Sequence, residues 1–121
     1  MKKALILALL AAATAAHAQN DGLTAFESHG TMHYAMVPTD KARDLDYMEK
    51  AAYKFCQDQN KGSCRVMIWA ESLDKPTGNP FHTRYSENRL ADYTRNYGPV
   101  DRILFNCKVV TTAPANRCYQ Q

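Results

Sequence analysis

The chain has 121 residues, of which 45% are hydrophobic, and its formal net charge of +3 arises from 15 basic and 12 acidic side chains. This length accommodates one domain with a single modest core. The nearly balanced charge gives no support to nucleic-acid binding, because domains with that function carry a marked excess of Lys and Arg.

The first 18 residues have the pattern of a bacterial secretory signal peptide. Two lysines precede an apolar run from residue 4 to residue 13, and Ala16-His17-Ala18 is the small-x-small pattern after which signal peptidases cut. No segment approaches the roughly 20 apolar residues of a membrane-spanning helix. We therefore expect cleavage after Ala18, a periplasmic or secreted location and no stable membrane insertion. Removal of 18 residues from 121 leaves 103, with a net charge of about +1.

All four cysteines follow the signal pattern: Cys56, Cys64, Cys107 and Cys118. An even number in a small exported domain indicates two disulfides. Of the three possible pairings we favour Cys56 with Cys64 and Cys107 with Cys118, because each pair is close in sequence and separated by loop-like residues. A zinc site is the alternative, but the four cysteines lack the short Cys-x2-Cys or Cys-x4-Cys spacing typical of such sites. We expect no cofactor.

In chain order, residues 19–30 are polar and are expected to form a flexible lead-in with at most a short strand or turn. A single domain should then occupy residues 31–121. Residues 31–37 favour a first strand that stops at Pro38. Residues 41–59 predict a helix with Thr39 or Asp40 as its N-cap, because one apolar stripe runs along it at spacings of three and four. The stripe consists of Leu45, Met48, Ala52 and Phe55.

Residues 64–70 give the clearest strand pattern in the chain. Four consecutive apolar residues from Val66 to Trp69 predict a strand covered on both faces, or one that packs Trp69 against a loop. Residues 71–82 contain two prolines and a glycine in polar company, and they predict a long loop of the kind that often carries contacts.

The last third of the chain predicts a second helix and a final strand. Residues 86–97 favour a helix with Ser86 as N-cap and with Leu90, Tyr93 and Tyr97 on its buried side. Residues 103–112 alternate as a strand does, and residues 113–121 form a tail held back by Cys118. The expected fold is α+β, or small α/β, in the order strand, helix, strand, helix, strand. It would have a three-stranded sheet, two helices on one face and two disulfides.

Three histidines are candidates for a metal site or for the active site of a small hydrolase. His29 and His33 are four residues apart, and His82 could supply a third ligand. The β-like residues around the first two argue against a shared helix, so exposed or partly packed side chains are the alternative. A catalytic serine would need a neighbouring base, but Ser28, Ser72 and Ser86 occur in no nucleophile motif. We name no catalytic residue.

The segment from residue 84 to residue 102 interleaves arginines with tyrosines, the residue types that dominate binding hot spots. The candidates for partner binding are Arg84, Tyr85, Arg89, Arg95 and Trp69. The structural alternative places Tyr93 and Tyr97 in the core and pairs the arginines with nearby acidic side chains.

A set of landmarks resembles small exported bacterial proteins of unassigned function: Ala51-Ala52, Phe55-Cys56, Gly62 to Cys64, Val66 to Trp69, Tyr93-x-Arg95-Asn96 and Phe105-Asn106-Cys107. The resemblance implies a fold and a compartment but no activity. The leading hypothesis is a non-enzymatic binding module, an inhibitor or immunity-type protein acting on a protein partner in the cell envelope. A small hydrolase or metal-binding protein using His29, His33 and His82, and a structural envelope protein, are the alternatives. The sequence does not predict the oligomeric state.

Overall fold

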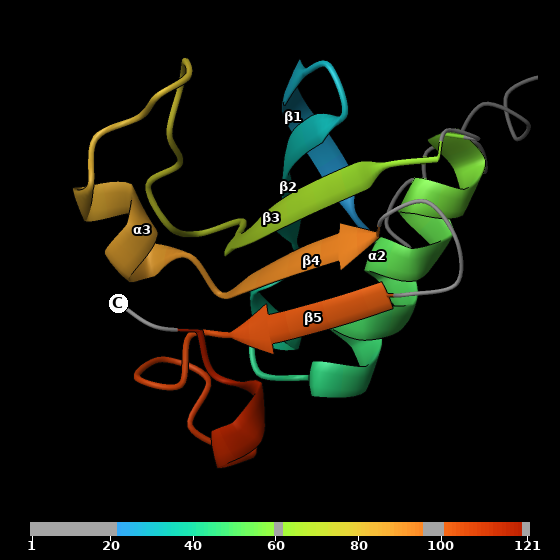
Figure 1. The fold of residues 1–121 in the computed structure, drawn as a ribbon. Helices are drawn as coiled ribbons and strands as arrows, with labels where there is room; N and C mark the ends of the chain where they lie inside the picture. Colours follow the sequence, from blue (N-terminus) through green and yellow to red (C-terminus); the bar gives the residue numbers. More distant parts are fainter. Residues whose placement is uncertain (1–21, 60–61, 96–100, 120–121) are drawn as a thin grey trace, which may run out of the picture.

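The computed structural model describes residues 22–59, 62–95 and 101–119. These residues form one five-stranded mixed sheet with the strand order β1-β2-β3-β4-β5, which Figure 1 shows beside its helices. The strands are β1 (Thr24–His29), β2 (Met32–Val37), β3 (Cys64–Ala70), β4 (Ala91–Arg95) and β5 (Asp101–Phe105). The prediction of a three-stranded sheet is therefore wrong, whereas the predicted strand at residues 64–70 is confirmed.

The sheet is built around one parallel pair, β2 and β3, and its other neighbouring strands are antiparallel. The long helix α2 (Leu45–Gln59) connects β2 to β3, as a parallel pair requires. In Figure 1 it lies behind β4 and β5, so it covers one face of the sheet. The other helix, α3 (Arg84–Asn88), has only five residues.

The start of α2 is fixed by Asp44 rather than by Thr39 or Asp40. The Asp44 carboxylate accepts a hydrogen bond from the backbone N–H of Tyr47 at 3.0 Å, which satisfies one of the free donors at the helix start. Residues Thr39–Lys41 form the separate 3-10 turn η3. The predicted helix is thus confirmed, but it begins later than expected.

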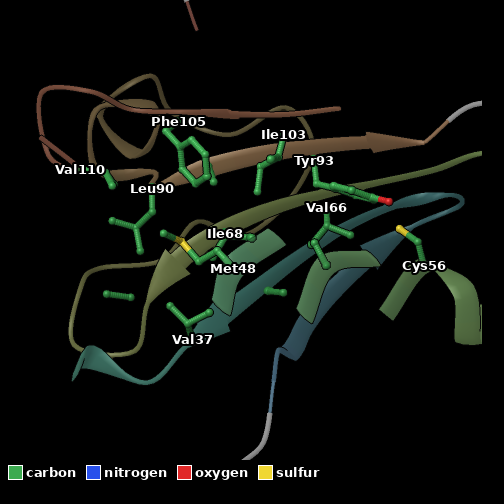
Figure 2. Close-up of a cluster of buried hydrophobic side chains, with 14 of the residues drawn as sticks. Val37, Met48, Cys56, Val66, Ile68, Leu90, Tyr93, Ile103, Phe105 and Val110 are labelled. Atoms are coloured by element: carbon green, nitrogen blue, oxygen red, sulfur yellow. The ribbon is translucent and has the colours of Figure 1, made fainter. Parts of the chain in front are cut away.

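The main core lies between α2 and the sheet, and Figure 2 shows side chains from both converging there. On α2, Met48, Ala52 and Cys56 are buried, while Leu45 and Phe55 pack at the margin. Val66 and Ile68 face them from β3, which agrees with the alternation of a strand. The predicted apolar stripe is confirmed as the buried side of α2.

Within the lead-in expected at residues 19–30, for which at most a short strand was predicted, residues 24–29 form the edge strand β1. Its pairing with β2 shifts between Ala25 and Glu27, as in a β-bulge. Because of the bulge, the neighbouring side chains of Phe26 and Glu27 both point to the face of the sheet opposite α2. This breaks the alternation of apolar and polar residues by which a strand is predicted from sequence. Residues 19–21 lie outside the described part of the chain.

The predicted helix at residues 86–97 is also wrong. Helix α3 ends at Asn88, Arg89 is extended with ψ of 135°, and β4 follows between β3 and β5. The spacing of Leu90 and Tyr93 suits a helix, but the alternation of buried Ala91 and Tyr93 with half-buried Asp92 and Thr94 suits a strand. Tertiary pairing on both sides decides in favour of the strand. Tyr97 lies outside the described residues.

The predicted length of the final strand and the predicted placement of both helices on one face are also wrong. The final strand stops at Phe105, because buried Asn106 turns the chain. Its side-chain amide donates to the Glu87 carbonyl at 2.9 Å and accepts from the Lys108 N–H at 3.1 Å. The two helices also do not share one face, since Tyr85 of α3 packs with Trp69 on the side opposite α2.

Both predicted disulfides are confirmed. Cys56 at the end of α2 is bonded to Cys64 at the start of β3, with 5.8 Å between their Cα atoms. Cys107 is bonded to Cys118, with 5.6 Å between Cα atoms, so the segment after β5 is tied back. Two disulfides are typical of a protein in an oxidising, extracellular environment. Within the described ranges, no helix has the length and apolar character that crossing a membrane requires.

Tyr93 makes the stability of the fold sensitive to alkaline pH. Its side chain is 1% exposed, and its hydroxyl is the single buried side-chain polar atom without a hydrogen-bond partner in residues 22–59, 62–95 and 101–119. Burial raises the pKa of Tyr93, and the nearby Asp101 carboxylate acts in the same direction. The folded state therefore retains the phenol proton at a pH where an unfolded tyrosine loses it.

Stability should accordingly be lost as the pH rises above about 10, the ordinary pKa of tyrosine, because only the unfolded state ionises there. We expect Tyr93→Phe to reduce this loss and to leave stability at pH 7 unchanged or higher by up to about 1 kcal/mol. Urea unfolding at neutral and alkaline pH measures both effects. The exposed Tyr53→Phe serves as the control and should keep the alkaline loss. A marked destabilisation of Tyr93→Phe at pH 7 would contradict this reading.

Candidate functional site

The face of the sheet opposite α2 has two halves with different chemistry. Over β1 to β3 lies an aromatic cluster in which Tyr34 and Trp69 are fully buried. Phe81 from the long loop closes over both rings, with centroids 5.4 Å from Tyr34 and 5.7 Å from Trp69. Phe26 and Tyr85 complete the cluster at its edges. This half is interior rather than surface.

The loop at residues 71–83 is held on the sheet by hydrogen bonds at Gly78. Its N–H donates to the Glu27 carboxylate at 2.6 Å, and its carbonyl accepts from the Tyr34 hydroxyl at 2.8 Å. The same Glu27 oxygen contacts His29 Nε2 at 2.6 Å. Gly78 has a φ of 80°, a conformation that glycine adopts without strain. The predicted loop is therefore present, and its centre is fixed to β1 and β2.

Over β3 to β5 the same side of the sheet is polar, and strand register aligns its side chains in rows. One row contains Met32, Arg65, Thr94 and Arg102, and the next contains Tyr34, Met67, Asp92 and Leu104. Because alternate residues of β4 and β5 pack against α2, these residues point away from it. We call the set Arg65, Arg89, Asp92, Thr94, Arg102 and Leu104 the arginine face.

Asp92 lies between two guanidinium groups on the arginine face. Arg65 grips it with two hydrogen bonds, Nε to Oδ1 at 3.0 Å and Nη2 to Oδ2 at 2.6 Å. Arg89 approaches the same carboxylate at 3.7 Å and stacks on the Tyr119 ring at 4.6 Å. The hydrogen bonds that Arg65 donates to Asp92 raise the pKa of Arg65, so this side chain stays charged.

The arginine face carries an excess of positive charge, with three arginines and one aspartate. Five of the seven arginines in the chain pair with or stack on another side chain: Arg65, Arg84, Arg89, Arg95 and Arg117. Arg102 and Arg43 have no such partner in the described residues. The Arg65 side chain is 44% exposed despite its pairing, so both Arg65 and Arg102 reach solvent from one row.

The candidate partner-binding residues from the sequence do not form a single surface. Arg84 and Tyr85 stack on each other at 4.6 Å beside the aromatic cluster, on the same side of the sheet as Arg89. Arg95 lies on the α2 side, where it pairs with Asp101 at 3.4 Å and stacks on Tyr53. Trp69 is fully buried and donates its Nε1–H to the Tyr85 carbonyl. Arg84, Tyr85 and Arg89 thus lie on the open side, Trp69 is buried beneath that side, and Arg95 lies on the α2 side.

Sequence reasoning missed Arg65. It follows Cys64 in a strand that is otherwise apolar, and the single exposed position in that run was the available signal. Its role depends on Asp92, which is 27 positions away, and this pairing emerges only from the strand register.

The three histidines do not assemble into one site. His29 and His33 occupy adjacent cross-strand positions and point to opposite faces, where His29 meets Tyr34 and His33 meets Phe55 of α2. His82 lies in the loop and accepts a hydrogen bond from the Arg84 N–H. No group of three potential metal-ligating His, Cys, Asp or Glu side chains occurs in the described ranges.

One serine does meet a histidine. Ser28 Oγ lies 2.7 Å from His33 Nδ1, with the serine exposed on the edge strand and the histidine 5% exposed beneath it. This contact satisfies a polar group of a buried ring, and it is also the first geometric requirement of an activated serine.

No protein-family model, curated protein or solved structure matches the chain in the comparisons with known proteins. The resemblance to small exported bacterial proteins therefore stays a prediction.

Proposed function

We propose that the protein is an exported, non-enzymatic binding module that holds an acidic segment of a protein partner against the arginine face. The observation that carries the proposal is the row of exposed guanidinium groups at Arg65 and Arg102, which Arg89 reinforces and Asp92 partly neutralises. At Arg102 the planar fork can pair with a partner carboxylate through two parallel hydrogen bonds, whereas Arg65 already directs its Nε and Nη2 at Asp92 and adds positive charge beside it.

The arginine face is preorganised, which favours binding. Arg65 is anchored on Asp92, and Arg89 is held by Tyr119, whose hydroxyl donates to the Arg89 carbonyl at 2.8 Å. Side chains that are already fixed lose less conformational freedom when a partner arrives. The strand backbones beneath them are joined in a continuous ladder.

The N-terminal pattern and the cysteines together support the proposed export. A signal peptide at residues 1–18, cleaved after Ala18, would deliver the chain to the periplasm or the medium, where both disulfides are stable. There a rigid scaffold with one charged face suits an inhibitor or immunity-type protein that occludes a partner. No cofactor takes part in this function.

A pair of double variants tests the proposal. Arg65→Ala/Arg102→Ala removes two charges from the arginine face, whereas Lys50→Ala/Lys108→Ala removes two exposed charges elsewhere. We expect the first to lower recovery of the bound partner from envelope extracts at least about 10-fold, since a charge-assisted hydrogen bond contributes about 1.5 to 3 kcal/mol. The second should bind as the wild type does. Equal recovery of the partner with the two double variants would refute the proposal that the arginine face binds it.

A second candidate function, a small hydrolase, is favoured by the contact between Ser28 and His33 alone. A serine activated by this histidine would react with a fluorophosphonate probe, and the label would disappear in Ser28→Ala and His33→Gln. An absence of labelling in the folded protein would remove this candidate.

A further inference from the structure

A separate groove lies on the α2 side, at the carboxyl ends of the two parallel strands. Its volume is about 400 Å³, within the range of small-molecule sites. Asp40 and Arg43 line it from the segment after β2, and Ser72 and Leu73 line it from the segment after β3. In open α/β sheets ligands bind outside the carboxyl ends of parallel strands, and the groove has that position relative to β2 and β3.

The groove has an apolar floor and a charged rim. Ala70, Leu73, Leu90 and Val109 supply the floor, and they belong to the main core or pack against it. Asp40, Arg43 and Ser72 are exposed at the rim. The floor can therefore bury an apolar side chain while the rim stays available for polar groups.

Two opposite charges on this rim are unused. Asp40 and Arg43 are three residues apart, yet within the described parts of the chain neither forms an ion pair or a side-chain hydrogen bond, even with the other. Arg43 thus lacks a side-chain partner in the part of the chain that the structure describes, unlike the five arginines that pair or stack. It also lies on the opposite side of the sheet from Arg65. Each charge is thus free to meet a ligand group of opposite sign.

From this arrangement we infer that the groove binds a small zwitterion with apolar side chains, of the size of a dipeptide. The ligand carboxylate pairs with the Arg43 guanidinium, and its ammonium donates to the Asp40 carboxylate. Its side chain covers Leu73 and Val109 in the floor. A ligand with only negative groups is disfavoured, because Asp40 repels it. The site is independent of the proposed function of the arginine face.

The dipeptide L-leucyl-L-leucine is the probe, and two derivatives dissect its recognition. The N-acetyl form lacks the ammonium, and the C-terminal amide lacks the carboxylate. Titration followed by amide NMR shifts should give saturable binding of the dipeptide at concentrations up to about 10 mM, with shifts centred on Leu73 and Val109. Each derivative should bind at least about 10-fold more weakly, because one charged hydrogen bond is lost.

Variants then assign each charge. In Arg43→Gln the dipeptide and its amide should bind equally weakly, because the group that recognises the carboxylate is gone. In Asp40→Asn the dipeptide and its N-acetyl form should bind equally weakly, because the group that recognises the ammonium is gone. Arg102→Gln, which removes the other unpaired arginine, is the matched control and should leave binding unchanged. The inference is overturned if the dipeptide gives no saturable shift, or if discrimination between the dipeptide and its amide survives Arg43→Gln.

Discussion

Replacing Cys56 and Cys64 together with alanine is expected to lower the free energy of unfolding by about 3 to 5 kcal/mol. Their loop of eight residues accounts for about 2.5 kcal/mol through the entropy of the unfolded chain. The remainder comes from packing, since both residues are at most 1% exposed and join α2 to β3 inside the core. Urea unfolding of the double variant measures the loss.

The second disulfide provides the matched comparison. Cys107 and Cys118 close a longer loop, with a separation of 11 residues, but both are half-buried. Their double alanine variant should lose only about 2 to 3 kcal/mol, nearly all of it from chain entropy. A larger loss here than at Cys56 and Cys64 would show that loop length, rather than burial, determines the contribution of each bond.

Trp69→Ala should destabilise the fold by about 3 to 5 kcal/mol, because it empties the centre of the aromatic cluster. Trp69 is fully buried, and its ring lies 5.7 Å from Tyr34 and 6.0 Å from Phe26 between ring centroids. The substitution also leaves the Tyr85 carbonyl without the indole N–H that donates to it at 2.9 Å. Chemical unfolding followed by circular dichroism provides the measurement.

Two variants separate packing from hydrogen bonding at this position. Trp69→Phe keeps an aromatic ring and should cost less, about 1 to 3 kcal/mol, most of it from the lost hydrogen bond and the smaller ring. Tyr53→Ala removes an aromatic side chain that is 42% exposed and should cost less than about 1 kcal/mol. A loss of stability in Trp69→Ala as small as that in Tyr53→Ala would contradict this expectation. It would show that the aromatic cluster, on which the loop at residues 71–83 packs through Phe81, contributes little to the free energy of unfolding.

Local sequence patterns predicted those elements whose structure depends on residues close to them in sequence. The stripe along α2 repeats at helical spacing, and the strand Cys64–Ala70 is continuous and apolar. The two disulfides join cysteines that are close in sequence, so spacing alone favoured the correct pairing.

The elements that failed depend on distant partners. Ala91–Arg95 becomes a strand because it fills the position between β3 and β5, although Leu90 and Tyr93 also suit a helix. Thr24–His29 becomes the edge strand β1 with a bulge that hides its alternation. No single-sequence pattern contains the register that decides between these outcomes.

The candidate site was predictable only in part for the same reason. The enrichment in arginine and tyrosine after residue 84 pointed to Arg84, Tyr85 and Arg89, which do lie on the open side of the sheet. Arg65 joins Arg89 through Asp92, and that connection requires β3 to pair with β4. A surface that combines residues from several strands cannot be predicted before the order and register of those strands are known.

Site-specific photo-crosslinking in cells tests the central claim, that the arginine face is the contact surface of an exported module. Benzoylphenylalanine in place of Leu104 lies on that face and leaves its three arginines intact, whereas the same group in place of Lys50 lies exposed on α2. We predict a discrete crosslinked protein in the envelope fraction from position 104 and none from position 50. Crosslinks from position 50 alone, or equal crosslinks from both positions, would contradict the account.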